Sequence, residues 1–149
     1  MKTKNLKDES VTLIIDRTYS TLNEYILECR RNKYKGAEFK KNDEIWTAYY
    51  IMSKKIEPIP IEWFPLTLQF TFYEKNTKRD MDNVMGYAHK IILDALQKTI
   101  LPQDNWKVVR KIEDEFDIDK NNPRIELVIK PYFDKNGNRP TITKKSKKE

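Results

Sequence analysis

The alternation of hydrophobic and polar residues is clearest around residues 66–73. Hydrophobic side chains occupy every second position there, at Leu66, Leu68, Phe70 and Phe72. A period of two predicts a strand with one buried face. Shorter runs of the same kind predict strands at 11–15, 108–118 and 124–132. Because the turn-rich segment DKNNP joins the last two, we expect them to form an antiparallel hairpin.

Hydrophobic positions spaced three and four residues apart predict three helices. The first begins at Thr21, which makes a capping-box pattern with Glu24, and Gly36 is its expected stop. The second covers about residues 40–54, and the third begins near Asn83. This order of elements predicts an α+β fold, a single domain in which α-helices pack on one side of a small mixed β-sheet.

Length and charge narrow the class of protein. The chain has 149 residues, which suits one domain at residues 1–133 followed by a basic, flexible tail at residues 134–149. A net charge of +6 favours a polyanionic partner, nucleic acid before an anionic membrane, although a merely solvated surface explains this charge equally well.

The composition also excludes several classes of site. Cys29 is the only cysteine and His89 the only histidine, so a disulfide, a cysteine zinc cluster and a multi-histidine site are excluded within one chain. The spacing of Cys29 on an apolar helix stripe predicts core packing. Because we find neither a secretion signal nor a long apolar stretch, we expect a cytoplasmic protein of a bacterial cell.

The segment KRDMDN, between the strongest strand and the third helix, carries the candidate chemistry. An extended chain points Asp80 and Asp82 to the same side, where two carboxylates repel each other unless a cation neutralises them. Hard carboxylate oxygens suit Mg²⁺ or Mn²⁺. The alternative is that one aspartate caps the helix and the other lies in a solvated turn.

Two further residues are candidates for the same site. Lys90 lies on a helix stripe that leans toward the aspartates, so it can stabilise charge on a phosphate; an ordinary surface pair with Asp94 is the alternative. Asp104 follows the third helix and is a candidate third carboxylate, or an ordinary turn aspartate.

Two basic stretches are candidates for contact with a phosphate backbone. The first contains Arg30, Arg31, Lys33 and Lys35 with Tyr34 interleaved, and the second contains Lys144, Lys145, Lys147 and Lys148. For both stretches, a solvated surface is the alternative.

Three ordered motifs, KRDMDN, HKIILDAL and QDNWKVV, resemble the RusA family of Holliday junction resolvases, in particular its phage and prophage branch. The resemblance covers about residues 12–131. It implies a homodimeric, magnesium-dependent endodeoxyribonuclease that resolves four-way DNA junctions by paired symmetric nicks.

The resemblance also implies roles for individual residues. Asp80, Asp82 and Asp104 match the family's essential, metal-binding carboxylates, and Lys90 matches a lysine before the motif Asp-Ala-Leu. Arg79, with Lys78 beside it, matches the basic position ahead of the first aspartate and is expected to contact DNA.

Two features depart from the family pattern. The segment from Asp82 to Asp94 is one helical turn longer than in the shorter branch of the family, and Gln103 stands where many relatives carry an acidic residue. Two other functions stay open: a noncatalytic nucleic-acid-binding module, and a metal-dependent nuclease for flaps, nicks or RNA.

Overall fold

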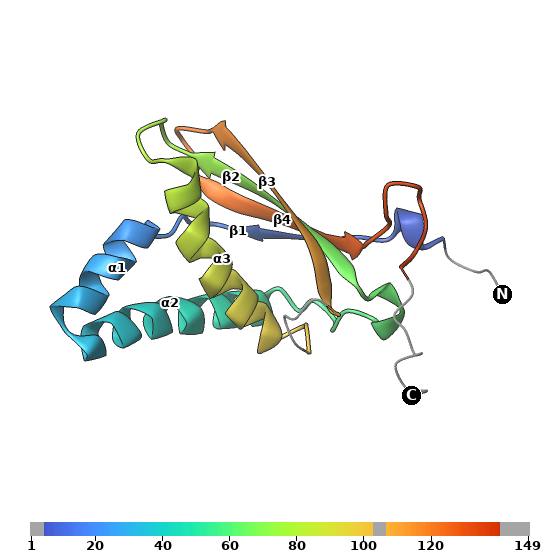
Figure 1. The fold of residues 1–149 in the computed structure, drawn as a ribbon, viewed down its shortest axis with the longest axis horizontal. Coiled ribbons are helices and arrows are strands. Elements are labelled where there is room, and N and C mark those ends of the chain that lie inside the picture. Colours follow the sequence, from blue (N-terminus) through green and yellow to red (C-terminus); the bar gives the residue numbers. More distant parts are fainter. Residues whose placement is uncertain (1–4, 103–106, 141–149) are drawn as a thin grey trace.

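The computed structural model describes residues 5–102 and 107–140, which form a four-stranded sheet with three α-helices (Figure 1). The strands are β1 (Val11–Ile15), β2 (Leu66–Glu74), β3 (Val109–Ile118) and β4 (Arg124–Pro131). The helices are α1 (Leu22–Arg31), α2 (Lys33–Ser53) and α3 (Met81–Gln97), and two short 3-10 helices are η1 (Leu6–Asp8) and η2 (Ile61–Trp63). The expected α+β class with a mixed sheet is confirmed.

The strand order is β1-β4-β2-β3, so the predicted hairpin of β3 and β4 is wrong. β2 lies between these two strands. β2 pairs in parallel with β3, and α3 is the connection between these two strands. β4 pairs antiparallel with both β2 and β1. A short turn therefore connects two strands that are not neighbours in the sheet.

Burial explains why β4 and not β3 is an inner strand. In β4 every second side chain is buried, at Ile125, Leu127, Ile129 and Pro131. β3 instead carries Glu113, Asp114, Glu115 and Asp117 from its middle to its end and buries only Val109. A charged strand is stable at a sheet edge, where it also discourages pairing with other chains.

One face of the sheet forms the core. Leu13 and Ile15 of β1 and the alternating apolar residues of β2 and β4 are buried on it, and α3 contributes Val84, Tyr87 and Ile91. The other face is more polar and more exposed. The helices gather on the buried side (Figure 1), as expected, and no helix among the described residues is long and apolar enough to cross a membrane.

The capping box that opens α1 is confirmed, because the Thr21 and Glu24 side chains each accept the other residue's backbone N–H. The predicted stop at Gly36 is wrong: α2 already begins at Lys33, and Gly36 is buried inside it. Because Gly36 has no side chain, α1 can approach α2 closely at Cys29. A Cβ at Gly36 would lie only 2.8 Å from the Cys29 Cα. Cys29 itself is exposed, so the prediction that it packs in the core is also wrong.

Residues 134–140, which we assigned to the flexible tail, are tied to the domain. Asp134 accepts hydrogen bonds from the backbone N–H groups of Asn136 and Asn138. The Arg139 guanidinium donates to five backbone carbonyls, among them those of Tyr132 and Phe64, both at 2.7 Å. The structured part of the chain therefore extends past the expected boundary at residue 133.

Candidate metal site at the start of α3

The two candidate aspartates lie at the start of α3, after the segment that connects β2 to this helix. Asp80 is the N-cap residue of α3 with an extended backbone (φ −69°, ψ 140°), and Asp82 lies in the first helical turn. Both side chains are exposed. The helix N-terminus presents backbone N–H groups and a partial positive charge, which favour anions at this position.

Neither carboxylate makes a side-chain contact that fixes it in the fold. Asp80 occupies the N-cap position, yet its side chain makes no capping hydrogen bond. Within the described part of the chain, Asp80 and Asp82 have no ion-pair or side-chain hydrogen-bond partner. Asp80 therefore takes the N-cap position that the alternative assigns to one aspartate, but it lacks the side-chain hydrogen bond that a capping aspartate makes. Two exposed carboxylates two residues apart, neither paired within the described chain, are the kind of oxygen donor that a hard divalent cation prefers.

Arg79, directly before Asp80, is fully engaged within the chain. Its Nε and Nη2 donate to the two carboxylate oxygens of Glu74 at 3.0 and 3.2 Å, and its Nη1 donates to the Tyr19 carbonyl at 2.8 Å. Glu74 is buried to 8 % exposure. The predicted contact of Arg79 with DNA is not tested by this arrangement, but every guanidinium nitrogen already has a protein acceptor.

Sequence reasoning missed Glu74, although a signal was present. Glu74 has the same parity in β2 as the buried residues Phe70 and Phe72. A carboxylate on the core side of a strand needs a partner, because burying an unpaired charge is costly. The place of Glu74 in the alternating pattern therefore predicts a basic partner close by, and in the structure that partner is Arg79.

Asn83, directly after Asp82, ties the other side of this turn to α1. Its Oδ1 accepts the backbone N–H of Asn23 at 2.9 Å. One turn further along α3, a Cβ at Gly86 would lie 3.1 Å from the Leu22 Cδ2, so the start of α1 packs closely on α3. The residues on both sides of the aspartates thus bond to the backbone that leads into α1.

Lys90 is exposed and has no hydrogen-bond or ion-pair partner among the described residues. The alternative pair with Asp94 is absent, because Asp94 instead binds Lys40 of α2 at 3.0 Å. Burial opposes ionisation of Asp94, but the hydrogen bond from Lys40 and the positive charges of Lys40 and Lys98 outweigh that effect, so its pKa is lowered. Lys90 lies about 12 Å along the helix axis from Asp82, by the rise per residue of an α-helix.

Asp104, the third candidate carboxylate, lies outside the described residues, as does Gln103. The described chain on either side of it is at the far end of α3 from Asp80. Leu101 donates its N–H to Leu96 near the end of α3, and Val108 accepts from Leu66 at the start of β2. Among the described residues, no group of three acidic, cysteine or histidine side chains is arranged to hold a metal ion.

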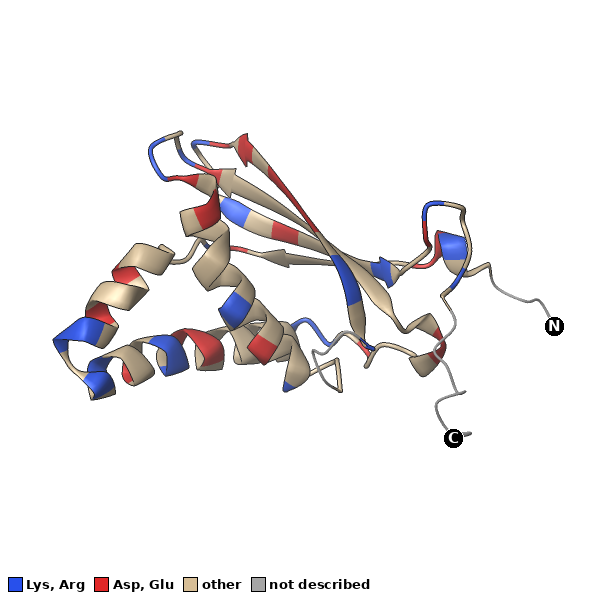
Figure 2. Ribbon diagram, in the orientation of Figure 1, with Lys and Arg blue, Asp and Glu red and all other residues tan. Residues whose placement is uncertain are grey.

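The predicted basic residues fall into two places. Lys78 is exposed in the turn before α3, and its N–H bonds to Asn76. Arg30, Arg31, Lys33 and Lys35 gather at the corner between α1 and α2, and all four are exposed (Figure 2). Since α1 has 10 residues, this corner lies about 15 Å along the α1 axis from the start of α1, where Asn23 bonds to Asn83.

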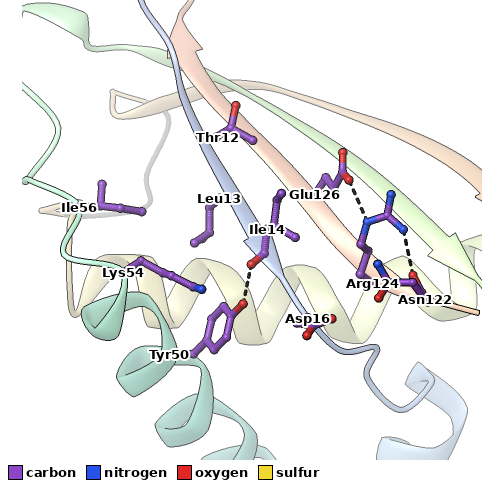
Figure 3. Close-up of a pocket in the computed structure, with 10 residues that line it drawn as sticks. All are labelled: Thr12, Leu13, Ile14, Asp16, Tyr50, Lys54, Ile56, Asn122, Arg124 and Glu126. Atoms are coloured by element: carbon purple, nitrogen blue, oxygen red, sulfur yellow. Dashed lines mark hydrogen bonds and ion pairs between the residues drawn. The ribbon is translucent and has the colours of Figure 1, made fainter.

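Two other features lie apart from the aspartates. His89 packs on Phe70 and bonds to Asp114 of β3 at 2.8 Å, which accounts for the only histidine in the chain. A hollow of about 800 Å³ runs beside β1 (Figure 3), where Arg124 already pairs with Glu126 at 2.9 Å. Neither feature includes Asp80 or Asp82.

No protein-family model matches this sequence, and no curated protein matches it either. The site is therefore interpreted from its own residues and from the resemblance of its motifs.

Proposed function

We propose that the chain is a magnesium-dependent endodeoxyribonuclease of the RusA kind, which resolves four-way DNA junctions by paired nicks. The observation that carries the proposal is the state of Asp80 and Asp82. Both stand exposed at a helix N-terminus, and neither side chain has a hydrogen-bond or ion-pair partner among the described residues. By the same resemblance, we propose a homodimer that works in the cytoplasm of a bacterial cell.

Phosphodiester hydrolysis requires an activated water and neutralised charge on the phosphate, and a bound magnesium ion supplies both. In this proposal Asp80 and Asp82 hold the ion, with Mn²⁺ as a substitute. The N-terminus of α3 orients backbone dipoles toward the phosphate, which lowers the cost of bringing an anion beside two carboxylates. Asp104 is the proposed third ligand.

Lys90 and the basic residues supply the remaining contacts. Lys90 has a free ammonium group on the α3 stripe below the aspartates and stabilises charge on the phosphate electrostatically. Lys78 and the corner formed by Arg30, Arg31, Lys33 and Lys35 contact the DNA backbone. Contacts of this kind set position and affinity, not sequence preference.

The test compares wild type, Asp82→Asn and Asp8→Asn on a labelled four-way junction and on linear duplex, with and without magnesium. Asp8 is also an exposed aspartate, in η1, so its variant is a matched control. We expect paired symmetric nicks from wild type and Asp8→Asn only with magnesium, and none from Asp82→Asn. Junction binding in the absence of metal should be preserved, because Asp82 packs against nothing.

Three other outcomes would contradict the proposal. Undiminished cleavage by Asp82→Asn would remove the aspartate pair from the chemistry. Binding without cleavage under all metals would identify a noncatalytic nucleic-acid-binding module. Preferential cleavage of flaps, nicks or RNA would keep the metal site but replace the junction as the substrate.

A further inference from the structure

We propose that Arg79 and Asn83 are positioning residues: held by Glu74 and by the backbone that leads into α1, they fix Asp80 and Asp82 as a pair for a divalent cation. This inference rests on the proposed function. It assigns Arg79 to the metal pair, where the sequence pattern assigned it to DNA.

The first step concerns geometry. The segment from Arg79 to Asn83 contains both aspartates, and its two end residues each bond to the chain that enters α1. Arg79 donates to the Tyr19 carbonyl at 2.8 Å, and Asn83 accepts from the Asn23 N–H at 2.9 Å. A turn that is bonded at both ends has little freedom to change the separation of the carboxylates it carries.

The second step concerns Glu74. Its two oxygens accept from the Nε and Nη2 of Arg79, and only 8 % of Glu74 is exposed. A two-point contact between planar groups fixes orientation as well as distance. Since Glu74 ends β2, the rigid sheet sets the direction of the Arg79 side chain and thereby the start of α3.

The third step concerns electrostatics. Two carboxylates that are to share one cation repel each other before the cation arrives, so a flexible turn would let Asp80 and Asp82 separate. If the fold already holds the two carboxylates close together, the free energy of their repulsion is met during folding and does not weaken the binding of the cation. Residues that hydrogen-bond to metal ligands typically contribute 10- to 100-fold to metal affinity or activity; Glu74 and Arg79 act on the aspartates through the backbone, so we expect them to contribute near the lower end of this range.

The experiment measures magnesium binding and DNA binding separately. Isothermal titration calorimetry of the full chain without DNA gives the Kd for magnesium, and metal-free titration with a four-way junction gives the Kd for DNA. The variants are Glu74→Gln, Arg79→Lys and Asn83→Ala. Glu126→Gln is the matched control, because it also weakens an arginine–carboxylate contact, that of Arg124, away from α3.

We expect Glu74→Gln and Arg79→Lys to raise the magnesium Kd about 10-fold or more, and Asn83→Ala to raise it in the same direction. The junction Kd should stay within about twofold of wild type, as should both values for Glu126→Gln. A role in stability alone does not produce this separation. If Glu74→Gln fails to fold, Arg79→Lys and Asn83→Ala still decide the question.

Three results overturn the inference. An unchanged magnesium Kd in the variants, with weaker metal-free junction binding by Arg79→Lys, would make Arg79 a DNA contact. A wild type that neither binds magnesium nor cleaves junctions would remove the proposed function, and this inference with it. A wild type that does both while the variants bind magnesium normally removes the positioning role only.

Discussion

Replacing Gly36 with alanine tests whether close packing explains the glycine inside α2. An alanine Cβ there would lie 2.5 Å from the Cys29 Sγ and 2.8 Å from the Cys29 Cα. The second atom belongs to the backbone of α1, so the two helices must separate. Overpacking of this kind costs about 1–3 kcal/mol, whereas alanine gains about 0.5–1 kcal/mol over glycine in a helix. The difference between these effects is a loss of about 0–2.5 kcal/mol, and because the clash involves backbone that cannot turn aside, we expect Gly36→Ala to lower the free energy of unfolding by the upper part of this range, about 1–2.5 kcal/mol.

Gly86→Ala is the matched control, because Gly86 is also inside a helix. Its added Cβ would meet the Leu22 Cδ2 at 3.1 Å, the end of a side chain that can move. Most of the gain in helix propensity from alanine is then kept, and we expect Gly86→Ala to raise the free energy of unfolding by between zero and about 1 kcal/mol. Urea unfolding followed by circular dichroism gives both values.

A third variant identifies the atom responsible. Adding Cys29→Ala to Gly36→Ala removes the contact with Sγ but leaves the Cys29 Cα in place, so it should restore only part of the loss. The reasoning is refuted if Gly36→Ala is as stable as wild type, or if Gly36→Ala and Gly86→Ala change stability equally.

The remaining predictions concern pH and the basic C-terminal segment. Burial raises the pKa of Tyr19 to about 12, so its contribution to stability is complete below the unfolded value near pH 10 and falls as pH rises toward 12, by about 1.4 kcal/mol per pH unit. Unfolding measured at pH 9 and pH 11 should show a smaller loss for Tyr19→Phe than for wild type, and parallel losses would contradict this. Residues 141–149 contain four lysines. Removing them should reduce the slope of log Kd for DNA against log salt concentration by up to about 0.9 for each phosphate contact that is lost. An unchanged slope would show that the segment is merely solvated.

Much of the candidate site could be predicted from local sequence. The motif around Asp80 and Asp82 placed them between a strand and a helix, and the structure has them at that junction. What sequence could not decide is whether Asp80 caps α3, because a capping aspartate and an uncapped one occupy the same position. The partners of Arg79 were equally hidden, since Tyr19 is 60 residues away.

The sequence by itself determined the elements of this protein, because their causes are local. Alternation predicted β2, the Thr21–Glu24 pair predicted the start of α1, and spacing predicted α3. The tertiary structure decided how these elements meet. A short turn between β3 and β4 suggested a hairpin, but the burial of apolar side chains on β4 placed that strand between β1 and β2.

Gly36 shows the same division in a single residue. In the sequence a glycine after a basic helix end is a stop signal, whereas in the structure it is the point where α2 approaches Cys29 of α1. Periods and caps depend on neighbours along the chain and can be read from it. Strand order, helix contacts and the arginine that orients an aspartate turn depend on which distant surfaces exclude water together, and that is settled only when the whole chain packs.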